Sequence, residues 1–407
     1  MTAPIVIVGA GQAAASFISR HVALGSRQTL LLIGEEPHPP YQRPPLSKKY
    51  LLGDLERDRL FIRPLQWYAE QNIGLRFGTR IGRIDPRNRQ VVTDTGEAID
   101  YDKLLLCTGS SARRLPASMG GELDGVFTLR SIADIDRQAP EFRAGRRLLI
   151  VGGGYIGLEA AAVARQLGLE VTLLEMAERI LQRVATAETS AYFRALHQGH
   201  GVDLRESARL ARLLDENGKV CGAELESGEI IAADLVLVGI GGSPNIELAQ
   251  AAGLECGNGI LVNAVCQTSD PNIFAAGDCS CFERDGQRIR LESVQNAADQ
   301  GDLVARHLAG EDISYSAMPW FWSDQYDCKL QIVGLNQGHT RTVTRPGNSE
   351  SSLSIWYYRD AELIAIDAMN EPRSYAFGRK IIEAGINPSP ELIADPATDL
   401  KALALGR

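Results

Sequence analysis

Two short glycine-rich stretches carry residue types and spacings that bind dinucleotides. The first reads IVIVGAGQAAA over residues 5–15, and the second reads LLIVGGGYIGLEAA over residues 148–161. Their small residues are Gly9, Gly11 and Ala14 in the first stretch, and Gly152, Gly154 and Gly157 in the second. In such a turn the first position allows a tight bend, the second lets a pyrophosphate approach the backbone, and the third lets a helix pack on the strand. One such turn could be an ordinary loop, but two in one chain favour two bound dinucleotides.

An acidic residue follows the strand after each turn. The stretch TLLLIG is followed by Glu35 and Glu36, and VTLLE ends in Glu175, 18 residues after Gly157. A carboxylate at this place accepts hydrogen bonds from ribose hydroxyls, and it disfavours the 2′-phosphate of NADP. No arginine follows Glu175 directly, although Arg179 is near enough to be an alternative phosphate ligand. The pattern predicts a preference for NADH over NADPH.

Two further stretches place polar residues at strand ends. LLLCTGSSARRLP (104–116) reads as a buried strand that ends in Thr108-Gly109, and TSDPNIFAAGDCS (268–280) contains a short strand that ends in Gly277-Asp278. Asp278 could accept a hydroxyl of a flavin ribityl chain, or it could simply be a turn residue. With two nucleotide turns present, we expect one permanently held flavin and one nicotinamide that comes and goes.

These segments require a sheet-and-helix scaffold to position them. The apolar run Ile5–Val8 predicts a central parallel strand, followed by a helix from Ala13 to about Leu24. Beyond residue 314 the pattern of apolar residues changes. Alternating apolar stretches such as LQIVG and SLSIWYY predict antiparallel strands. With 407 residues, the chain is long enough for two or three domains.

Composition narrows the class of protein. The net charge is −9, which argues against a nucleic-acid binder, because phosphate neutralisation needs clustered Lys and Arg. No apolar run approaches the roughly 20 residues of a membrane span, and the N-terminus lacks a signal-peptide layout, so a cytoplasmic location is expected.

The cysteines exclude a redox disulfide near the first turn. The loop HPPYQRPPLSKKYL (38–51) contains none, and the chain has seven: Cys107, Cys221, Cys256, Cys266, Cys279, Cys281 and Cys328. Their odd number and the absence of a CxxC pair predict reduced thiols and no metal site.

In their order along the chain, the motifs resemble the FAD-dependent pyridine-nucleotide disulfide oxidoreductases. More narrowly, YQRPPLSK, GGGYIGLE, RLESVQNA and PWFWSDQ resemble the NADH-dependent ferredoxin reductases of bacterial cytochrome P450 and ring-hydroxylating dioxygenase systems. The resemblance implies an α/β fold of glutathione-reductase type, with two Rossmann-like domains and an α+β C-terminal domain. The implied limits are 1–110 and 240–313 for the FAD domain, 111–239 for the NAD domain and 314–407 for the C-terminal domain.

The resemblance also implies cofactor contacts. For FAD they are Gly9, Gly11, Ala13, Ala14, Glu35, Lys48, Ile81, Thr108, Gly109, Arg130, Gly277, Asp278, Val294, Trp320 and Trp322. For NAD they are Gly152, Gly154, Tyr155, Ile156, Gly157, Glu159, Glu175, Gly241 and Glu292.

The implied catalytic pair is Lys48 and Glu159. Lys48 would stabilise the reduced flavin, and Glu159 would pair with it and help to position the nicotinamide, since an unpaired buried charge is costly. Read without the family, Lys48 is a solvated loop residue and Glu159 a residue on a helix surface. A hydride would pass from NADH to FAD, and single electrons would leave to a 2Fe–2S ferredoxin docked near the flavin edge.

The docking face is expected near PWFWSDQ, although its aromatic residues could instead be core residues at a domain junction. Basic residues should steer an acidic ferredoxin to this acidic protein. The candidates are Arg63, Arg373, Arg379 and Lys380, each of which could equally be an ordinary surface charge. The protein is expected to be a monomer. Which ferredoxin, oxygenase and final substrate it serves is not encoded in these motifs.

Three rival functions share this fold. An NADH oxidase or peroxidase would need an early redox cysteine, which is missing. A rubredoxin reductase is poorly discriminated, although PWFWSDQ favours a 2Fe–2S partner. A signalling protein of the apoptosis-inducing-factor kind would want a basic surface and a long insertion, and the net charge of −9 opposes it.

Overall fold

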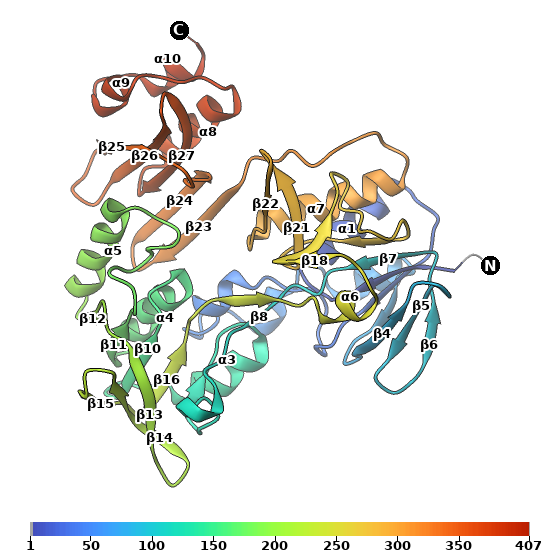
Figure 1. Cartoon of the computed structure of the whole chain (residues 1–407), viewed down its shortest axis with the longest axis horizontal. Coiled ribbons are helices and arrows are strands. Elements are labelled where there is room, and N and C mark those ends of the chain that lie inside the picture. The colour runs from blue at the N-terminus through green and yellow to red at the C-terminus, as the bar shows by residue number, and fades with distance from the viewer. Residues whose placement is uncertain (1–2, 407) are drawn as a thin grey trace. The chain divides into compact units, whose positions relative to one another are not determined.

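The computed structural model describes residues 3–406, and within that range the chain divides into two units. Unit 1 comprises the segment up to Arg43 together with Leu55–Ser111 and Gly242–Ala317. Unit 2 comprises Pro44–Asp54, Ala112–Gly241 and the segment from Met318 onward. Figure 1 shows the ribbon of the chain and labels most of the elements named below.

The units differ in two ways from the predicted domains. The resemblance places residues 44–54 in the FAD domain, but they belong to unit 2, because the turn Pro44–Ser47 packs on the helix after the second glycine-rich turn. The expected NAD and C-terminal domains also form one unit together. The division into three domains stays a prediction.

Unit 1 is built on a parallel sheet. Its strands are β1 (Ile5–Val8), β2 (Leu30–Ile33), β3 (Gly74–Arg76), β7 (Lys103–Leu106) and β20 (Ile273–Ala275). They lie in the order β20-β7-β1-β2-β3, so β1 has a neighbour on each side. All four residues of β1 are buried, as expected for an apolar strand covered on both faces. The predicted central strand is confirmed.

Two helices lie side by side on this sheet, α1 (Gln12–Ala23) and α7 (Val294–Leu308) (Figure 1). Their close approach depends on Gly301, because a Cβ atom there would lie 2.2 Å from the carbonyl oxygen of Ala13. Since α7 comes from the third segment of unit 1, this contact joins distant parts of the sequence around one core.

Smaller elements complete unit 1. The strands are β4 (Ile81–Asp85), β5 (Gln90–Thr93), β6 (Ala98–Asp100), β8 (Ser110–Ala112, whose last residue belongs to unit 2), β17 (Gly242–Pro244), β18 (Cys256–Gly257), β19 (Gly259–Val262), β21 (Ser280–Arg284) and β22 (Gln287–Ile289). The helices are α2 (Leu65–Glu70) and α6 (Glu247–Ala251).

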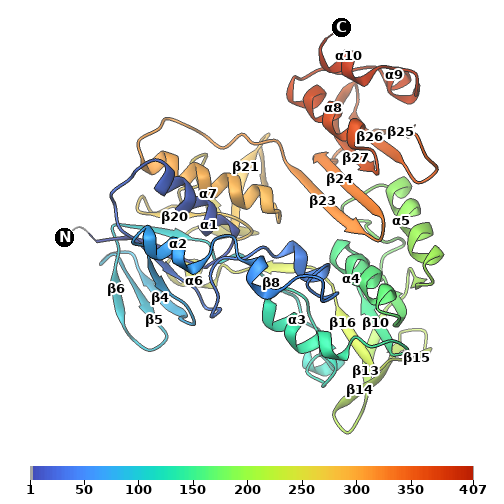
Figure 2. The same cartoon turned by 180° about the vertical axis from the view of Figure 1, so that it is seen from behind.

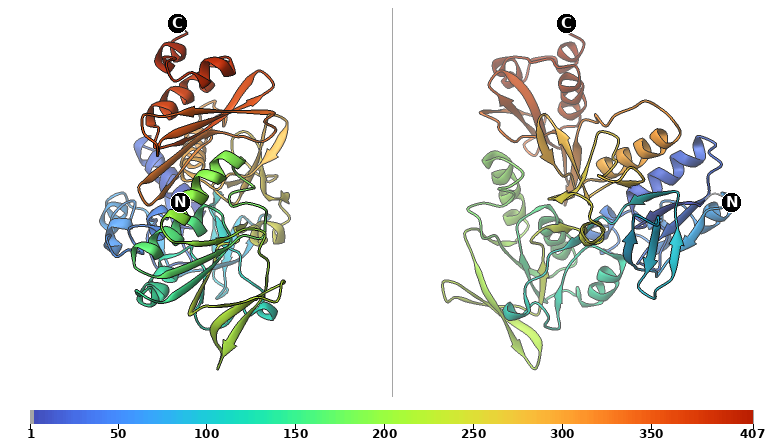
Figure 3. Two further views of the ribbon diagram at one scale, coloured as in Figure 1. Left: turned by 90° about the vertical axis from the view of Figure 1, so that its left-hand side faces the viewer. Right: turned by 45° about the vertical axis from the view of Figure 1, so that its right-hand side comes forward.

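Unit 2 contains a second parallel sheet of the same kind. Its strands are β9 (Val126–Phe127), β10 (Arg147–Val151), β11 (Glu170–Leu174), β12 (Asp203–Arg205) and β16 (Leu235–Val238), and its helices are α3 (Ile132–Gln138), α4 (Tyr155–Gln166) and α5 (Ala187–Gly199). The strand order is β12-β11-β10-β16-β9. An antiparallel sheet of β13 (Leu210–Glu216), β14 (Lys219–Leu225) and β15 (Ile230–Ala232) adjoins it, and its hairpin projects outward (Figure 3).

The last part of unit 2 is an antiparallel sheet with helices. Its strands are β23 (Trp320–Gln325), β24 (Cys328–Gly334), β25 (Arg341–Pro346), β26 (Leu353–Arg359) and β27 (Glu362–Met369). Helix α8 (Pro372–Glu383) lies across one face, followed by α9 (Pro390–Ala394) and α10 (Leu400–Ala404) (Figure 2). The two predicted antiparallel strands are β24 and β26, which both pair with β27. No helix within residues 3–406 is long and apolar enough to cross a membrane.

Candidate functional site

The first glycine-rich turn joins β1 to α1 at the carboxyl edge of the sheet. Gly9 has φ +104°, and a Cβ atom there would lie 2.1 Å from the carbonyl oxygen of Cys107 at the end of β7. Gly11 is different, because no described atom lies within 4 Å of its Cβ position. Ala14 is fully buried. The turn therefore leaves open space beside Gly11, at the N-terminus of α1, where an anionic group is favoured.

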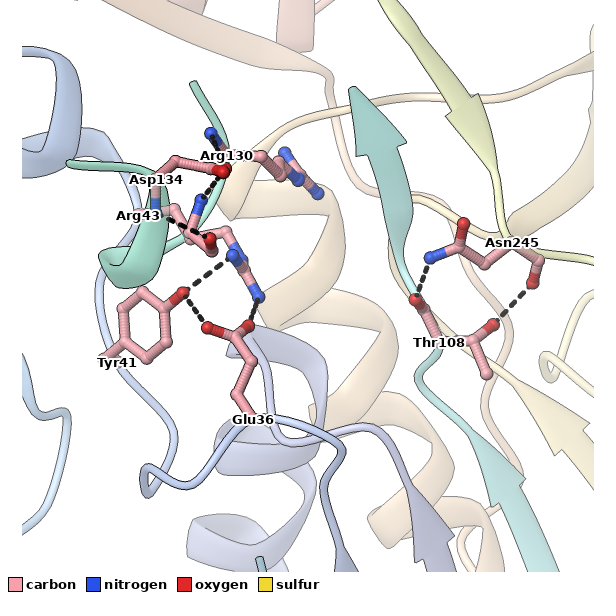
Figure 4. A network of polar contacts seen from close by, with 8 residues as sticks. Glu36, Tyr41, Arg43, Thr108, Arg130, Asp134 and Asn245 are labelled. Carbon is pink, nitrogen blue, oxygen red and sulfur yellow. Dashed lines mark hydrogen bonds and ion pairs between the residues drawn. The ribbon is translucent and has the colours of Figure 1, made fainter. Parts of the chain in front are cut away.

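The two acidic residues after β2 have separate surroundings. The Glu36 carboxylate accepts hydrogen bonds from Tyr41 Oη at 2.7 Å and from Arg43 Nη2 at 2.8 Å (Figure 4). The Glu35 side chain is 71% exposed and lies 3.7 Å from Arg80. Glu36 is thus held by its own unit, whereas Glu35 remains available for a ligand hydroxyl.

Thr108 and Gly109 are held by a residue that the sequence did not single out, Asn245. Thr108 Oγ1 donates to the Asn245 carbonyl at 2.7 Å, and Asn245 Nδ2 donates to the Thr108 carbonyl at 2.8 Å (Figure 4). Ser110 Oγ donates to Asp278 Oδ2 at 2.9 Å. These bonds gather the ends of β7 and β20 at the edge that also carries the first turn, which is where parallel sheets bind ligands.

The FAD contacts implied by the resemblance fall in both units. Those in unit 1 are Gly9, Gly11, Ala13, Ala14, Glu35, Ile81, Thr108, Gly109, Gly277, Asp278 and Val294, and those in unit 2 are Lys48, Arg130, Trp320 and Trp322. Ile81 opens β4 with its side chain in the apolar core, whereas Val294 is the first residue of α7. All of these roles stay predictions.

The second turn repeats the geometry of the first in unit 2. Gly152 has φ +111°, and a Cβ atom there would lie 2.5 Å from the carbonyl oxygen of Gly239. A Cβ atom at Gly157 would lie 2.1 Å from the carbonyl oxygen of Gly152, which explains the third glycine. Around the Cβ position of Gly154 there is again no described atom within 4 Å.

Glu175 is fixed beside this turn by backbone amides. Its Oε2 accepts from the N–H of Gly153, and its Oε1 accepts from the N–H of Ala177, each at 2.8 Å. Arg179, the alternative phosphate ligand, donates instead to the Ala185 carbonyl at 2.8 Å and to Ser190 Oγ at 2.6 Å. The acidic residue is therefore presented at the turn, while the nearby guanidinium is already engaged.

Sequence reasoning missed a second cation near this turn, Arg183. Its Nη2 lies 3.4 Å from the Cβ position of Gly241, which has φ +95°.

Of the other residues assigned to NAD, Ile156 is 42% exposed at the start of α4. Glu292 belongs to unit 1, where it pairs with Arg290, so its assignment to NAD stays a prediction.

Lys48 and Glu159 form a buried ion pair within unit 2. Lys48 Nζ lies 2.7 Å from Glu159 Oε2, and the two side chains are 18% and 6% exposed. The same carboxylate accepts from Ser47 Oγ at 2.6 Å and, through Oε1, from Ser323 Oγ at 2.7 Å. The predicted pairing is present, and the alternative of a solvated lysine and a surface glutamate is wrong. Neither serine was predicted.

The motif PWFWSDQ supplies Ser323 because of strand periodicity. Successive side chains of β23 point to opposite faces, so Phe321 and Ser323 share one face, and Trp320 and Trp322 the other. Phe321 packs on Tyr155 of α4, with ring centroids 4.9 Å apart, and the two tryptophan rings lie 5.5 Å apart. One face of the motif therefore reaches the second nucleotide turn.

Two known protein families match segments that together span most of the chain. Residues 3–301 match the family described as pyridine nucleotide-disulphide oxidoreductase, and residues 320–404 match the one described as reductase C-terminal. The chain belongs to the pyridine nucleotide-disulphide oxidoreductase family. A ferredoxin–NAD(P)(+) reductase of Sphingomonas is 41% identical over 401 residues, covering 98% of this chain and 96% of that protein. Putidaredoxin reductase of Pseudomonas putida is 38% identical over 405 residues, covering 98% and 96%.

Solved structures give the same result. The crystal structure of the covalent putidaredoxin reductase–putidaredoxin complex superposes with a TM-score of 0.96 at 38% identity, covering 99% of this chain and 98% of that chain. The resemblance inferred from the motifs and the predicted α/β architecture are confirmed. As an oxidoreductase family member with both nucleotide turns intact, the chain has the parts to bind a flavin and a nicotinamide.

This member of the disulphide oxidoreductase family has no disulfide within its described residues. All seven cysteines lie within residues 3–406 and are free thiols. Cys107, the first of them, is buried, and burial raises the pKa of its thiol well above the usual value. A thiol of this kind is a poor nucleophile, because the reactive species is the thiolate.

Helix α5 of this family member meets the C-terminal sheet through two buried titratable groups. Thr189 Oγ1 donates to Asp367 Oδ2 at 2.8 Å, and His197 Nε2 contacts Gln325 Oε1 at 2.8 Å. Burial raises the pKa of Asp367 to about 6 and lowers the pKa of His197 to about 4. Between pH 4 and 6 the two groups therefore affect stability in opposite directions.

Removing either group should expose the effect of the other. Asp367 binds a proton only in the folded state across this window, so its contribution to stability falls as pH rises, whereas His197 binds one only when unfolded, so its contribution rises. Asp367→Asn should make the free energy of unfolding rise more steeply with pH than in the wild type, by about 1.4 kcal/mol per pH unit, and His197→Gln should do the reverse. Urea unfolding at pH 4.5 and 6 measures both, with exposed Asp360→Asn as the control. Parallel pH profiles for all variants would contradict this.

Proposed function

We propose that the protein is an NADH-dependent ferredoxin reductase that holds FAD tightly and passes single electrons to a 2Fe–2S ferredoxin of a cytochrome P450 or ring-hydroxylating dioxygenase system. The observation that carries the proposal is a pair of nucleotide turns in a chain with no cysteine before Cys107. Electrons that reach such a flavin have no early dithiol to leave through, so an external acceptor must approach the flavin, and we propose that this acceptor is a 2Fe–2S ferredoxin. The relatives named as ferredoxin reductases match the chain over nearly its full length, which supports the same function.

The residues of unit 1 fit FAD. The space beside Gly11 and the first backbone amides of α1, which a helix leaves without an internal partner, suit a pyrophosphate. The exposed carboxylate of Glu35 suits a ribose hydroxyl. Asp278, oriented by Ser110, is an acceptor for a further hydroxyl. When bound, FAD supplies two-electron uptake from NADH and one-electron release to an iron–sulfur protein.

The residues of unit 2 fit NADH. The space beside Gly154 receives the pyrophosphate, and Glu175, already oriented by two backbone amides, accepts ribose hydroxyls. We propose that Lys48 places a positive charge that stabilises the reduced flavin, and that Glu159 holds Lys48 and borders the nicotinamide.

Removing the Glu175 carboxylate should weaken the preference for NADH. Because hydrogen bonds to a charged group contribute about 1.5–3 kcal/mol, Glu175→Ala should raise the KM for NADH about 10- to 100-fold and leave that for NADPH nearly unchanged. Steady-state rates with both cofactors measure this, and the exposed neighbour Glu178→Ala is the matched control. An unaltered ratio of the two efficiencies would place the specificity elsewhere.

We propose that the ferredoxin docks on a face that includes Trp320 and Trp322. Because the net charge of −9 opposes association with an acidic partner, nearby basic residues are needed to steer the ferredoxin to this face. Among the candidates, Arg379 pairs with Glu383 at 2.7 Å and Arg63 stacks over Trp67. Arg373 and Lys380 are exposed on α8.

The deciding experiment follows cytochrome c reduction by the purified yellow holoprotein with NADH, with and without an added 2Fe–2S ferredoxin. Reduction that requires the ferredoxin, and that weakens as salt is added, is the expected result. Rapid NADH consumption with oxygen as the only acceptor would identify an oxidase. Activity with rubredoxin but not with 2Fe–2S ferredoxin would identify a rubredoxin reductase.

A further inference from the structure

A chain of buried hydrogen bonds extends from Glu159 into the C-terminal sheet. Ser323 Oγ donates to Glu159 Oε1 at 2.7 Å, and Gln325 Nε2 donates to Ser323 Oγ at 3.1 Å. His197 Nε2 lies 2.8 Å from Gln325 Oε1. Ser323, Gln325 and His197 are all fully buried, so no solvent competes for these bonds. This series of hydrogen bonds joins α4, β23 and α5.

Every hydrogen bond in the series from His197 to Glu159 has a defined donor. His197 is neutral near pH 7, because burial lowers its pKa to about 4, and its Nδ1 has no hydrogen-bond partner among the described residues. Its proton therefore lies on Nε2 and is donated to Gln325 Oε1. This orients the amide so that its Nε2 donates to Ser323, which leaves the serine hydrogen free to be donated to Glu159. The donors all point toward the carboxylate.

Glu159 receives donors from two directions. Ser47 and Lys48 approach Oε2 from the segment 44–54, and Ser323 approaches Oε1 from the C-terminal sheet. A carboxylate held at both oxygens has little freedom to rotate, and linked buried bonds strengthen one another.

We propose that Ser323, held by Gln325 and His197, is a positioning residue that fixes the Glu159 carboxylate and, through it, Lys48. The C-terminal region thereby sets the geometry of the hydride-transfer site as well as contributing to a docking face. This inference rests on the proposed function, because it takes Glu159 and Lys48 to act in flavin reduction.

Two buried hydroxyl groups outside this series of hydrogen bonds, those of Thr189 and Ser354, provide comparison variants. Thr189 Oγ1 donates to Asp367 and links α5 to the C-terminal sheet, but it has no bond to Glu159. Ser354 is equally buried in that sheet and accepts from Trp356 Nε1. Thr189→Val and Ser354→Ala therefore disturb packing but remove none of the hydrogen bonds that link His197 to Glu159.

The test is a double-mutant cycle on the rate at which saturating NADH reduces bound FAD, followed by stopped-flow absorbance in the holoprotein. Ser323→Ala should slow reduction about 10-fold and Gln325→Leu about 5-fold, whereas Ser323→Thr, which keeps the hydroxyl, should stay within about 2-fold of the wild type. In a Glu159→Gln background, Gln325→Leu should change the rate less than about 2-fold, because its effect passes through Glu159. The two comparison variants should reduce at the wild-type rate.

Several results would overturn the proposal. If Gln325→Leu slows reduction equally in both backgrounds, its effect is on packing and not on Glu159. If Ser323→Ala is silent while Glu159→Gln is slow, positioning fails and the proposed function stands. If Glu159→Gln itself is silent, the role of Glu159 fails and positioning falls with it. Should Gln325→Leu not retain FAD, Ser323→Ala is carried through the same cycle.

Discussion

Replacing Lys48 with alanine should slow the reduction of bound FAD by NADH about 100-fold. The variant removes a cation from a site where Lys48 and Glu159 lie 2.7 Å apart. It leaves the carboxylate buried, and among residues 3–406 the remaining side-chain donors to it are the hydroxyls of Ser47 and Ser323. Both effects should oppose flavin reduction, because Lys48 would supply the positive charge that stabilises a reduced flavin, and the unpaired Glu159 carboxylate would add a buried negative charge. Stopped-flow loss of flavin absorbance under saturating NADH measures the rate.

The adjacent Lys49 provides the control for this variant. Its side chain is exposed in the same loop, so Lys49→Ala changes net charge equally without altering the buried pair. Lys49→Ala should reduce at the wild-type rate, and both variants should retain FAD. A Lys48→Ala protein that keeps its flavin and is reduced at the wild-type rate would remove Lys48 from the mechanism.

Valine at Gly11 should abolish FAD retention, and valine at Gly154 should spare FAD but weaken NADH binding, each by about 100-fold or more. Neither position requires glycine for its backbone, since φ and ψ are −108° and −163° at Gly11 and −81° and 179° at Gly154, where other residues are allowed. Neither Cβ position has a described atom within 4 Å. The side chains would therefore enter only the space assigned to each pyrophosphate.

The two variants control for each other. Flavin content after purification and NADH titration of the flavin spectrum distinguish them, and circular dichroism reports the fold. Gly199→Ala, at the end of α5, adds a methyl group in equally open space away from both turns and should be silent. If Gly11→Val remains yellow, or if Gly154→Val binds NADH normally, the corresponding nucleotide lies elsewhere.

Much of the site could be predicted because its signals are local. The turn glycines are set by close backbone approaches within a strand–turn–helix unit, as the contacts of Gly9, Gly152 and Gly157 demonstrate. Strand ends at Thr108 and Asp278 could be placed for the same reason. Fold class followed from the buried strands and the order of the motifs.

The residues that were missed depend on long-range contacts. Ser47, Ser323 and Asn245 are single polar residues whose partners lie 112, 164 and 137 positions away. No local periodicity marks such a pairing, because it exists only once the elements have packed. Even the Lys48–Glu159 pair came from family resemblance and not from spacing.

The assignment of residues 44–54 to unit 2 has a consequence for exchanging parts between related reductases. The chain changes unit at 43/44, 54/55, 111/112, 241/242 and 317/318, so neither unit is one contiguous stretch of gene. A chimera that transplanted only residues 112–241 would separate Glu159 from Ser47, Lys48 and Ser323 of its own lineage. Recombination that preserves function must therefore carry an eleven-residue loop and the C-terminal sheet along with the nucleotide-binding segment.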